Sequence, residues 1–307
     1  TIGYLGEFNP DASSISIPVL NRAGIPQISA TDGAAGLTTA GPGAFPGEPE
    51  KYYPTGARTF ARVVPSDSIE AAAQVDLQLS LDCARTYVLD DQTVYGADLA
   101  NIFEHEAGPA GLGIAGIEGY DAGASSYAAP AATVAATRAD CVFLSAMAES
   151  NAAAVTAAVG AALPRAKIFI SDGVADDTYF DPDRRGIPLA LDRRLYATMA
   201  PLTEGAYPPA SRAFFAAYRA HYGPVGPYAI YGYAAMSLML RAIDRATDHG
   251  RRVAQRSKVL AAIFATHDRR SVLGIYSIDR QGDTTLRRYG AYRAAGGRLV
   301  FLRTFQG

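Results

Sequence analysis

Acidic and hydroxyl side chains stand directly after four short apolar runs of this chain. Gly6-Glu7-Phe8-Asn9 follows TIGYL, and Ala30-Thr31-Asp32-Gly33 follows IPQIS. A third loop begins with Asp90-Asp91 after TYVL, and Ser171-Asp172-Gly173 follows KIFI. A side-chain carboxylate suits an ammonium group, and backbone N–H groups at a helix start suit a carboxylate. These residue types predict loops that bind a small charged molecule. The loops show no combination of residues typical of a catalytic site.

The apolar runs themselves predict an α/β fold class. They are short, rich in β-branched or aromatic residues, and without a clean polar alternation, which is typical of strands buried on both faces of a parallel sheet. Helix-like stretches separate them, as expected for an alternating α/β chain. In open α/β sheets, ligands bind in the crevice outside the carboxyl ends of the strands. We therefore expect the polar loops to converge on a small molecule.

The rest of the chain continues this alternation. Ser66 or Asp67 can cap a helix that begins near Ser68 and carries Glu70 in its first turn. Residues 173–209 have little periodicity and are interpreted as irregular, whereas the tail 272–305 is interpreted as β-rich. The sequence also predicts strands at 58–64, 111–121 and 140–147, and helices at 11–23, 95–108, 127–138, 150–163, 210–222, 228–247 and 252–266.

Bulk composition excludes several classes of protein. A chain of 307 residues exceeds what one compact core usually serves, which favours two lobes. The net charge is −2 and no long basic stretch exists, so we expect no nucleic acid partner. No apolar run reaches roughly 18 residues, so we expect no direct membrane insertion. The chain opens on a strand, so any export signal would precede Thr1.

The two cysteines and the four histidines indicate no metal site. Cys83 ends a predicted helix and Cys141 begins a strand; we expect two buried free thiols, with one disulfide as the alternative in an oxidising compartment. The acid-rich segment 176–185 is interpreted as solvated, although it leaves a divalent cation open. We expect no cofactor, and surface positions for the histidines, which are His105, His221, His249 and His267.

Enzyme motifs are absent or misplaced. The chain has no P-loop and no GxSxG, and its GLGIAG at 111–116 lies before or inside a predicted strand rather than opening a helix. We therefore expect no enzyme, and an α/β enzyme such as an amide hydrolase stays as an alternative.

The chain resembles the solute-binding proteins of branched-chain amino acid ABC transporters, which have the type I periplasmic-binding fold. The resemblance rests on the order and spacing of several stretches over nearly the whole chain: IGYLGEFN, SIPVLNRAGIPQISA, FARVVPSD, VLDDQTVYGADLA, ADCVFL, ISDGVAD, YAIYGYAAMSLMLRAI and VLGIYSIDRQGD. It implies two Rossmann-like lobes joined by three crossing strands, with a ligand cleft between them. The lobes would comprise residues 1–65 with 204–288, and 66–203 with 289–307.

The resemblance also implies ligand-binding residues. In the first lobe they match the loop Gly6, Glu7 and Phe8, the loop Thr31, Asp32 and Gly33, and the wall residue Tyr228. Glu7 replaces the small hydroxyl residue usual in amino acid binders, which favours a ligand with a cationic or donor-rich group, or a Glu7 side chain that turns away.

In the second lobe, Tyr95 matches the aromatic that covers the ligand, and Asp172 matches the acid that binds its ammonium. Met147 stands where another aromatic is common. We expect Tyr95 and Tyr228 to face each other from opposite lobes. We also expect Glu7 and Asp172 both to point into the cleft, where their repulsion favours a ligand with an ammonium or several N–H donors.

One departure concerns the start of the chain. Family members have a strand, a helix and a strand before the segment that matches TIGYL, so we expect an unfilled or externally filled sheet position beside it, and a longer native chain.

The function implied is capture of a small polar solute, an amino acid or a related compound, for an ABC importer by closure of the two lobes. The expected partner is the membrane permease, and the expected location is extracytoplasmic. The alternative is a ligand-sensing module of a receptor or regulator on the same fold.

Overall fold

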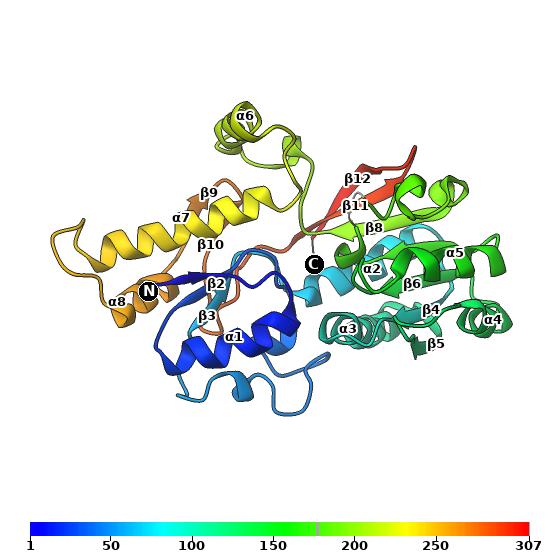
Figure 1. Cartoon of the computed structure of the whole chain (residues 1–307), viewed down its shortest axis with the longest axis horizontal. Coiled ribbons are helices and arrows are strands. Elements are labelled where there is room, and N and C mark those ends of the chain that lie inside the picture. The colour runs from blue at the N-terminus through cyan, green and yellow to red at the C-terminus, as the bar shows by residue number, and fades with distance from the viewer. Residues whose placement is uncertain (176–177, 307) are drawn as a thin grey trace. The chain divides into compact units, whose positions relative to one another are not determined.

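The computed structural model describes residues 1–175 and 178–306 and divides into two units (Figure 1). Unit 1 comprises residues 1–66 and 201–287, and unit 2 comprises residues 67–200 and 288–307. The chain therefore passes from one unit to the other three times. Within the described ranges, no helix is both long enough and apolar enough to cross a membrane.

Unit 1 begins with a small parallel sheet. Its strands are β1 (Tyr4–Leu5), β2 (Gln27–Ser29) and β3 (Phe60–Arg62), in that order, and β1 has a strand neighbour on one side only among the described residues. Helix α1 (Pro10–Arg22) connects β1 to β2. It begins where it does because the Asn9 side chain accepts a hydrogen bond from Ala12 N at 3.1 Å, and Gly24, with φ +62°, stands just past its end.

The remainder of unit 1 is mainly helical. Its helices are α6 (Ser211–Tyr222), α7 (Ala229–Ala246) and α8 (Arg256–Phe264), and its antiparallel pair is β9 (Arg269–Ser271) with β10 (Gly274–Tyr276). Helix α7 buries Ile230, Ala234, Leu238 and Ala242, whose spacing of four residues places them on one face. That face packs toward β2 and α8.

Unit 2 is built on one seven-stranded sheet with the order β12-β11-β8-β7-β6-β4-β5. The central strands are parallel, and β11 pairs antiparallel with both β8 and β12. The strands are β4 (Arg85–Asp90), β5 (Gly113–Gly119), β6 (Cys141–Ser145), β7 (Lys167–Ile170), β8 (Leu195–Met199), β11 (Arg288–Ala294) and β12 (Leu299–Gln306).

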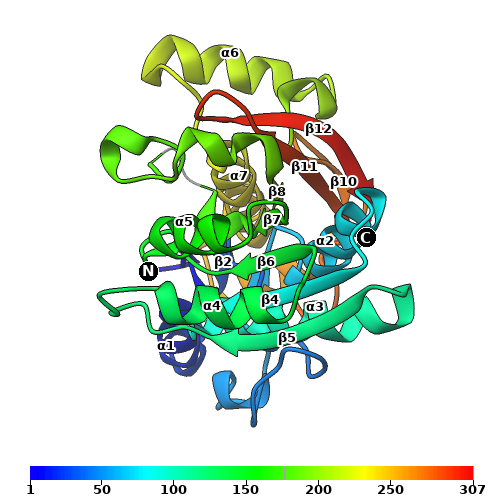
Figure 2. The same cartoon turned by 90° about the vertical axis from the view of Figure 1, so that its right-hand side faces the viewer.

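Helices cover this sheet in two pairs. Figure 2 shows α2 (Asp67–Ser80) and α3 (Val94–Ala110) as one pair and α4 (Ala128–Ala136) with α5 (Ala152–Ala162) as the other. An apolar core fills the side of α4 and α5, with Leu144, Val155 and Ile168 among its buried members. The parallel order brings the loops after β4, β6 and β7 to the same edge of the sheet.

Two expectations from the sequence are wrong. Strand β8 lies inside the segment 173–209 that was expected to be irregular, and its pairing with β7 and β11 holds these five residues extended despite the weak pattern. Cys83 and Cys141 form a disulfide rather than two free thiols. They meet because β4 and β6 are neighbours with Thr86 opposite Cys141, which brings the two cysteine Cα atoms to 5.9 Å.

The GLGIAG segment has no dinucleotide-binding geometry. Gly111 caps the end of α3 with φ +84°, and the residues from Gly113 onward form β5. The glycines therefore lead directly into a strand and do not open a helix, as the sequence predicted.

Candidate ligand-binding loops

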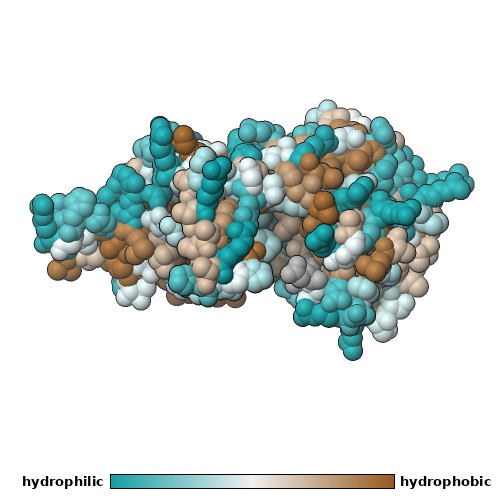
Figure 3. Space-filling model, turned by 90° about the horizontal axis from the view of Figure 1, so that it is seen from above, coloured by the Kyte–Doolittle hydropathy of each residue, from teal (hydrophilic) through white to brown (hydrophobic). Residues whose placement is uncertain are grey.

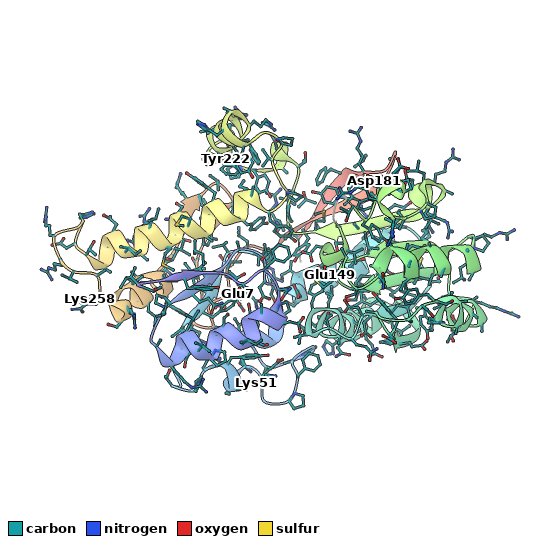
Figure 4. The ribbon with its side chains drawn as sticks, viewed as in Figure 1. Glu7, Lys51, Glu149, Asp181, Tyr222 and Lys258 are labelled. Carbon is teal, nitrogen blue, oxygen red and sulfur yellow. A yellow bond between two sulfur atoms is a disulfide. The ribbon has the colours of Figure 1, made fainter. Side chains whose placement is uncertain are left out.

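In unit 1, hydrogen bonds join the loops that follow β1 and β2. Ser29 Oγ donates to the carbonyl of Glu7 at 2.8 Å, and Thr31 Oγ1 donates to the carbonyl of Phe8 at 2.8 Å. Since β1 and β2 are parallel, both loops leave the same edge of the sheet. Gly6, Glu7, Phe8 and Thr31 therefore lie together, and Figure 4 shows Glu7 in the connection between β1 and α1.

The Glu7 carboxylate is half-buried and oriented by a neighbour. Tyr4 donates its hydroxyl hydrogen to Glu7 Oε1 at 2.7 Å. This hydrogen bond, followed by burial and the charge of Glu7, raises the pKa of Tyr4. Phe8 is 64% exposed, and its ring lies 6.4 Å from the ring of Tyr228 in an edge-to-face arrangement. The unit 1 group thus combines one oriented acid with two aromatic rings.

Asp32 and Gly33 lie beneath this group rather than on its surface. Both are buried. Burial raises the pKa of Asp32 to about 6, although the Ser13 hydroxyl, the Arg62 charge and the backbone N–H of Ala34 each lower it. Ala30 and Thr31 of this loop remain partly exposed.

Arg62 holds this second loop in place from below. Its guanidinium is fully buried and donates to the carbonyl of Ala34 at 2.7 Å, to Thr38 Oγ1 at 2.7 Å and to Asp283 Oδ1 at 2.8 Å. A buried charge is costly unless it is paired and hydrogen-bonded, and Asp283 supplies the opposite charge. Arg62 therefore supports the shape of the loop without facing a solute.

In unit 2, Tyr95, Met147 and Asp172 lie together. The Tyr95 hydroxyl donates to Asp172 Oδ1 at 2.6 Å and accepts from the backbone N–H of Gly173 at 3.2 Å. A Cβ atom on Gly173 would lie 2.6 Å from Tyr95 Cε1 and 2.9 Å from Met147 Sδ, so only glycine fits between them. Tyr95 lies in the first turn of α3, which follows β4, whereas Met147 and Asp172 lie just after β6 and β7.

A fully buried carboxyl group lies behind this set. Glu70 Oε1 accepts from the backbone N–H of Asp172 at 2.9 Å and from Thr198 Oγ1 at 2.7 Å. Burial raises the pKa of Glu70 well above its usual range, and the charges of Asp172 and Asp67 raise it further. The pKa of Tyr95 is also raised, first by burial and then by the charge of Asp172. This edge of unit 2 is acidic, and it would gain from a cationic group nearby.

Sequence reasoning missed four residues that shape these loops. Asp91 joins the loops after β4 and β6, because its Oδ2 accepts from the backbone N–H of Met147 at 2.8 Å. Ser29 and Arg62 stand at or beside strand ends and carry no signal of their own. Glu70 was interpreted only as an acid in the first turn of a helix, and its position in α2 does not reveal that α2 packs against β8 and β11.

The structure adds no metal centre to this picture. Across residues 1–175 and 178–306, no cluster of three or more His, Cys, Asp or Glu side chains can hold a metal ion. Asp176 and Asp177 of the acid-rich segment lie outside the described residues. The four histidines are exposed, as the sequence predicted, and His249 Nδ1 lies 2.9 Å from Asp244 Oδ2.

A sequence model described as periplasmic binding protein matches residues 5–298, nearly the whole chain. The chain belongs to this family. The type I periplasmic binding proteins are the group that the sequence resemblance indicated, and that prediction is confirmed. No curated protein shows significant sequence similarity to the chain.

Solved structures share the fold of this periplasmic binding protein. A leucine-binding protein from Thermotoga maritima has a TM-score of 0.81 at 18% identity, over 100% of this chain and 80% of that chain. An ABC transporter substrate-binding protein from Desulfitobacterium hafniense in complex with Leu has a TM-score of 0.76 at 17% identity, over 98% and 80%. A solute-binding protein from Rhodopseudomonas palustris in complex with p-hydroxybenzoic acid has a TM-score of 0.77 at 15% identity, over 99% and 78%.

Proposed function

We propose that this periplasmic binding protein is the extracytoplasmic solute-binding component of an ABC importer. It captures a small polar solute and delivers it to a membrane permease. The match of the family over residues 5–298 is the observation that carries the proposal. The unit 1 loops and the unit 2 loops each present side chains of the kinds that hold such a solute, and we propose that one solute contacts both sets.

We further propose that the solute carries an ammonium group or several N–H donors. Glu7 in unit 1 and Asp172 in unit 2 each present a partly exposed carboxyl group, and the charge of Asp67 acts on the same group of unit 2 residues. Charge-assisted hydrogen bonds to a cationic group would offset this concentration of negative charge. A carboxylate alone, without an amine, would meet repulsion at Asp172.

Proteins of related fold bind solutes with an amine and solutes without one, so the presence of an amine in the solute needs a direct test. The structures named above include one with Leu and one with p-hydroxybenzoic acid. We would titrate the protein calorimetrically with L-leucine and with 4-methylpentanoate, which keeps the side chain and the carboxylate but lacks the amine. We expect the amine-bearing member of this pair, and of analogous pairs of other amino acids, to bind more tightly.

Variants separate the role of Asp172 from a general effect of charge. Asp172→Asn should reduce the preference for the amine, whereas Asp183→Asn, at an exposed acid of the same unit, should leave it unchanged. Equal affinity for both members of every pair would contradict the amine proposal. Absence of any solute binding, with normal folding, would contradict the solute-binding function itself.

A further inference from the structure

Unit 1 contains a positively charged hollow that the proposed solute site does not use. It has a volume of about 270 Å³ and lies among α7, α8 and β9. Four of its lining residues are arginines, Arg241 and Arg245 from α7 and Arg269 and Arg270 from β9. Asp268 is the one acid in the lining, so the formal charge of the hollow is +3 with His267 neutral, whereas the whole chain carries −2.

These guanidinium groups are not neutralised by neighbouring acids. Among the residues that the structure describes, the ion pairs involve Lys51, His249 and other arginines, and no carboxylate lies within ion-pair distance of these four. Arg269 is fixed by a hydrogen bond from its Nη2 to Ser237 Oγ at 2.8 Å, while Arg241, Arg245 and Arg270 are exposed. Like charges held around one hollow repel, and a bound anion would relieve that repulsion.

The hollow is separate from the candidate solute loops of the same unit. Tyr228 stands at the start of α7, and Arg241 and Arg245 come 13 and 17 residues later. At 1.5 Å per helical residue, this places them roughly 20 to 25 Å along the helix from Tyr228. In Figure 3, the left-hand end, where the connection from α7 to α8 lies in Figure 1, is predominantly hydrophilic.

We propose that this hollow binds a small anion from solution that carries two or more negative charges, such as a phosphate-bearing compound. The planar guanidinium donates pairs of hydrogen bonds that match the oxygen atoms of phosphate. Several guanidinium groups around one small volume favour an anion with more than one negative charge. Asp268 and the carboxyl end of α7 oppose binding, but they are outnumbered by the arginines.

Pyrophosphate and inorganic phosphate are the probes for this proposal. Calorimetric titration would compare the wild type with Arg241→Gln, Arg245→Gln and the double variant, at low salt and at physiological salt, with sodium chloride at equal ionic strength as the blank. We expect saturable binding of pyrophosphate that each single variant weakens on the order of tenfold and the double variant abolishes. Because both side chains are exposed, the thermal unfolding temperature should not change.

Arg251→Gln is the matched control. Arg251 is exposed, stands shortly after α7 and does not line the hollow, yet its replacement removes the same charge. The proposal is overturned if the wild type does not bind pyrophosphate, or if Arg251→Gln weakens binding as much as Arg245→Gln. It is also overturned if the arginine variants lose binding to acidic phospholipid vesicles while free pyrophosphate never binds, because the surface would then recognise a membrane.

Discussion

Asp32 should make the stability of unit 1 depend on pH. Its carboxyl group is 1% exposed, and burial raises its pKa from 3.8 to about 6. A pKa that is higher in the folded state means that folding favours the protonated acid. The stabilisation is therefore fully present below pH 3.8, and it is lost as the pH rises to about 6.

The magnitude follows from the two pKa values. At about 1.4 kcal/mol for each pKa unit, the full effect is about 3 kcal/mol, of which roughly 2 kcal/mol falls between pH 4 and pH 7. The variant Asp32→Asn replaces the acid with a neutral group of the same shape, and its amide oxygen can still accept the hydrogen bond from Ala34 N, which is 3.3 Å long in the wild type. The variant should lack this part of the pH dependence.

Urea-induced unfolding at a series of pH values, followed by circular dichroism, measures the effect. Other buried acids, Glu70 among them, titrate in both proteins, so the informative quantity is the difference between wild type and Asp32→Asn at each pH. We expect the free energy of unfolding of the variant, relative to that of the wild type, to increase by about 2 kcal/mol from pH 4 to pH 7. Asp268→Asn, at an exposed acid of the same unit whose charge does not act on Asp32, should follow the wild type closely. A difference that stays constant across this range would refute the reasoning.

Two further predictions concern unit 2. Cys141→Ser opens a bridge between residues 58 apart, which should lower the free energy of unfolding by about 4 kcal/mol on chain entropy; the reduced wild type should match the variant, and a variant as stable as the oxidised wild type would contradict the prediction. Tyr95→Ala removes a buried ring beside Asp172 and should weaken solute binding by about 1–3 kcal/mol in calorimetry. The control is Tyr87→Ala, which removes a tyrosine of the same unit that is not among the candidate residues. Unchanged affinity in Tyr95→Ala would show that the Tyr95 ring does not contact the solute.

Much of the fold could be predicted because its signals are local. The runs that became β2, β4, β6 and β7 are apolar and β-branched, and each is followed by the turn residues that end a strand. The helix at 10–22 is bounded by residues typical of helix ends, with Asn9 before it and Gly24 after it. Strand β8 carries no such signal, because its five residues are held extended by neighbours from two distant parts of the chain.

The residues of the candidate site also fall into those that the sequence revealed and those that it did not. The loop residues were found because they stand at strand ends, which sequence spacing reveals. Their supports were missed because they act across the fold. Arg62 meets Asp283 from 221 residues away, and Glu70 meets Thr198 from 128 residues away. The disulfide stood only as the alternative to two free thiols for this reason, since it depends on which strands become neighbours in the sheet.

The division of unit 1 into two chain segments has a consequence for biosynthesis. The parallel strands β4 to β8 lie between residues 85 and 199, so a nascent chain can begin to assemble the sheet of unit 2 before the second part of unit 1 exists. Residues 1–66 must wait for residues 201–287, and contacts between such distant residues form slowly. During that interval the Arg62 guanidinium has not yet met Asp283. We expect a ribosome-bound chain that stops short of Asp283 to hold the parallel strands β4 to β8 in order, without β11 and β12, and to have a protease-sensitive unit 1.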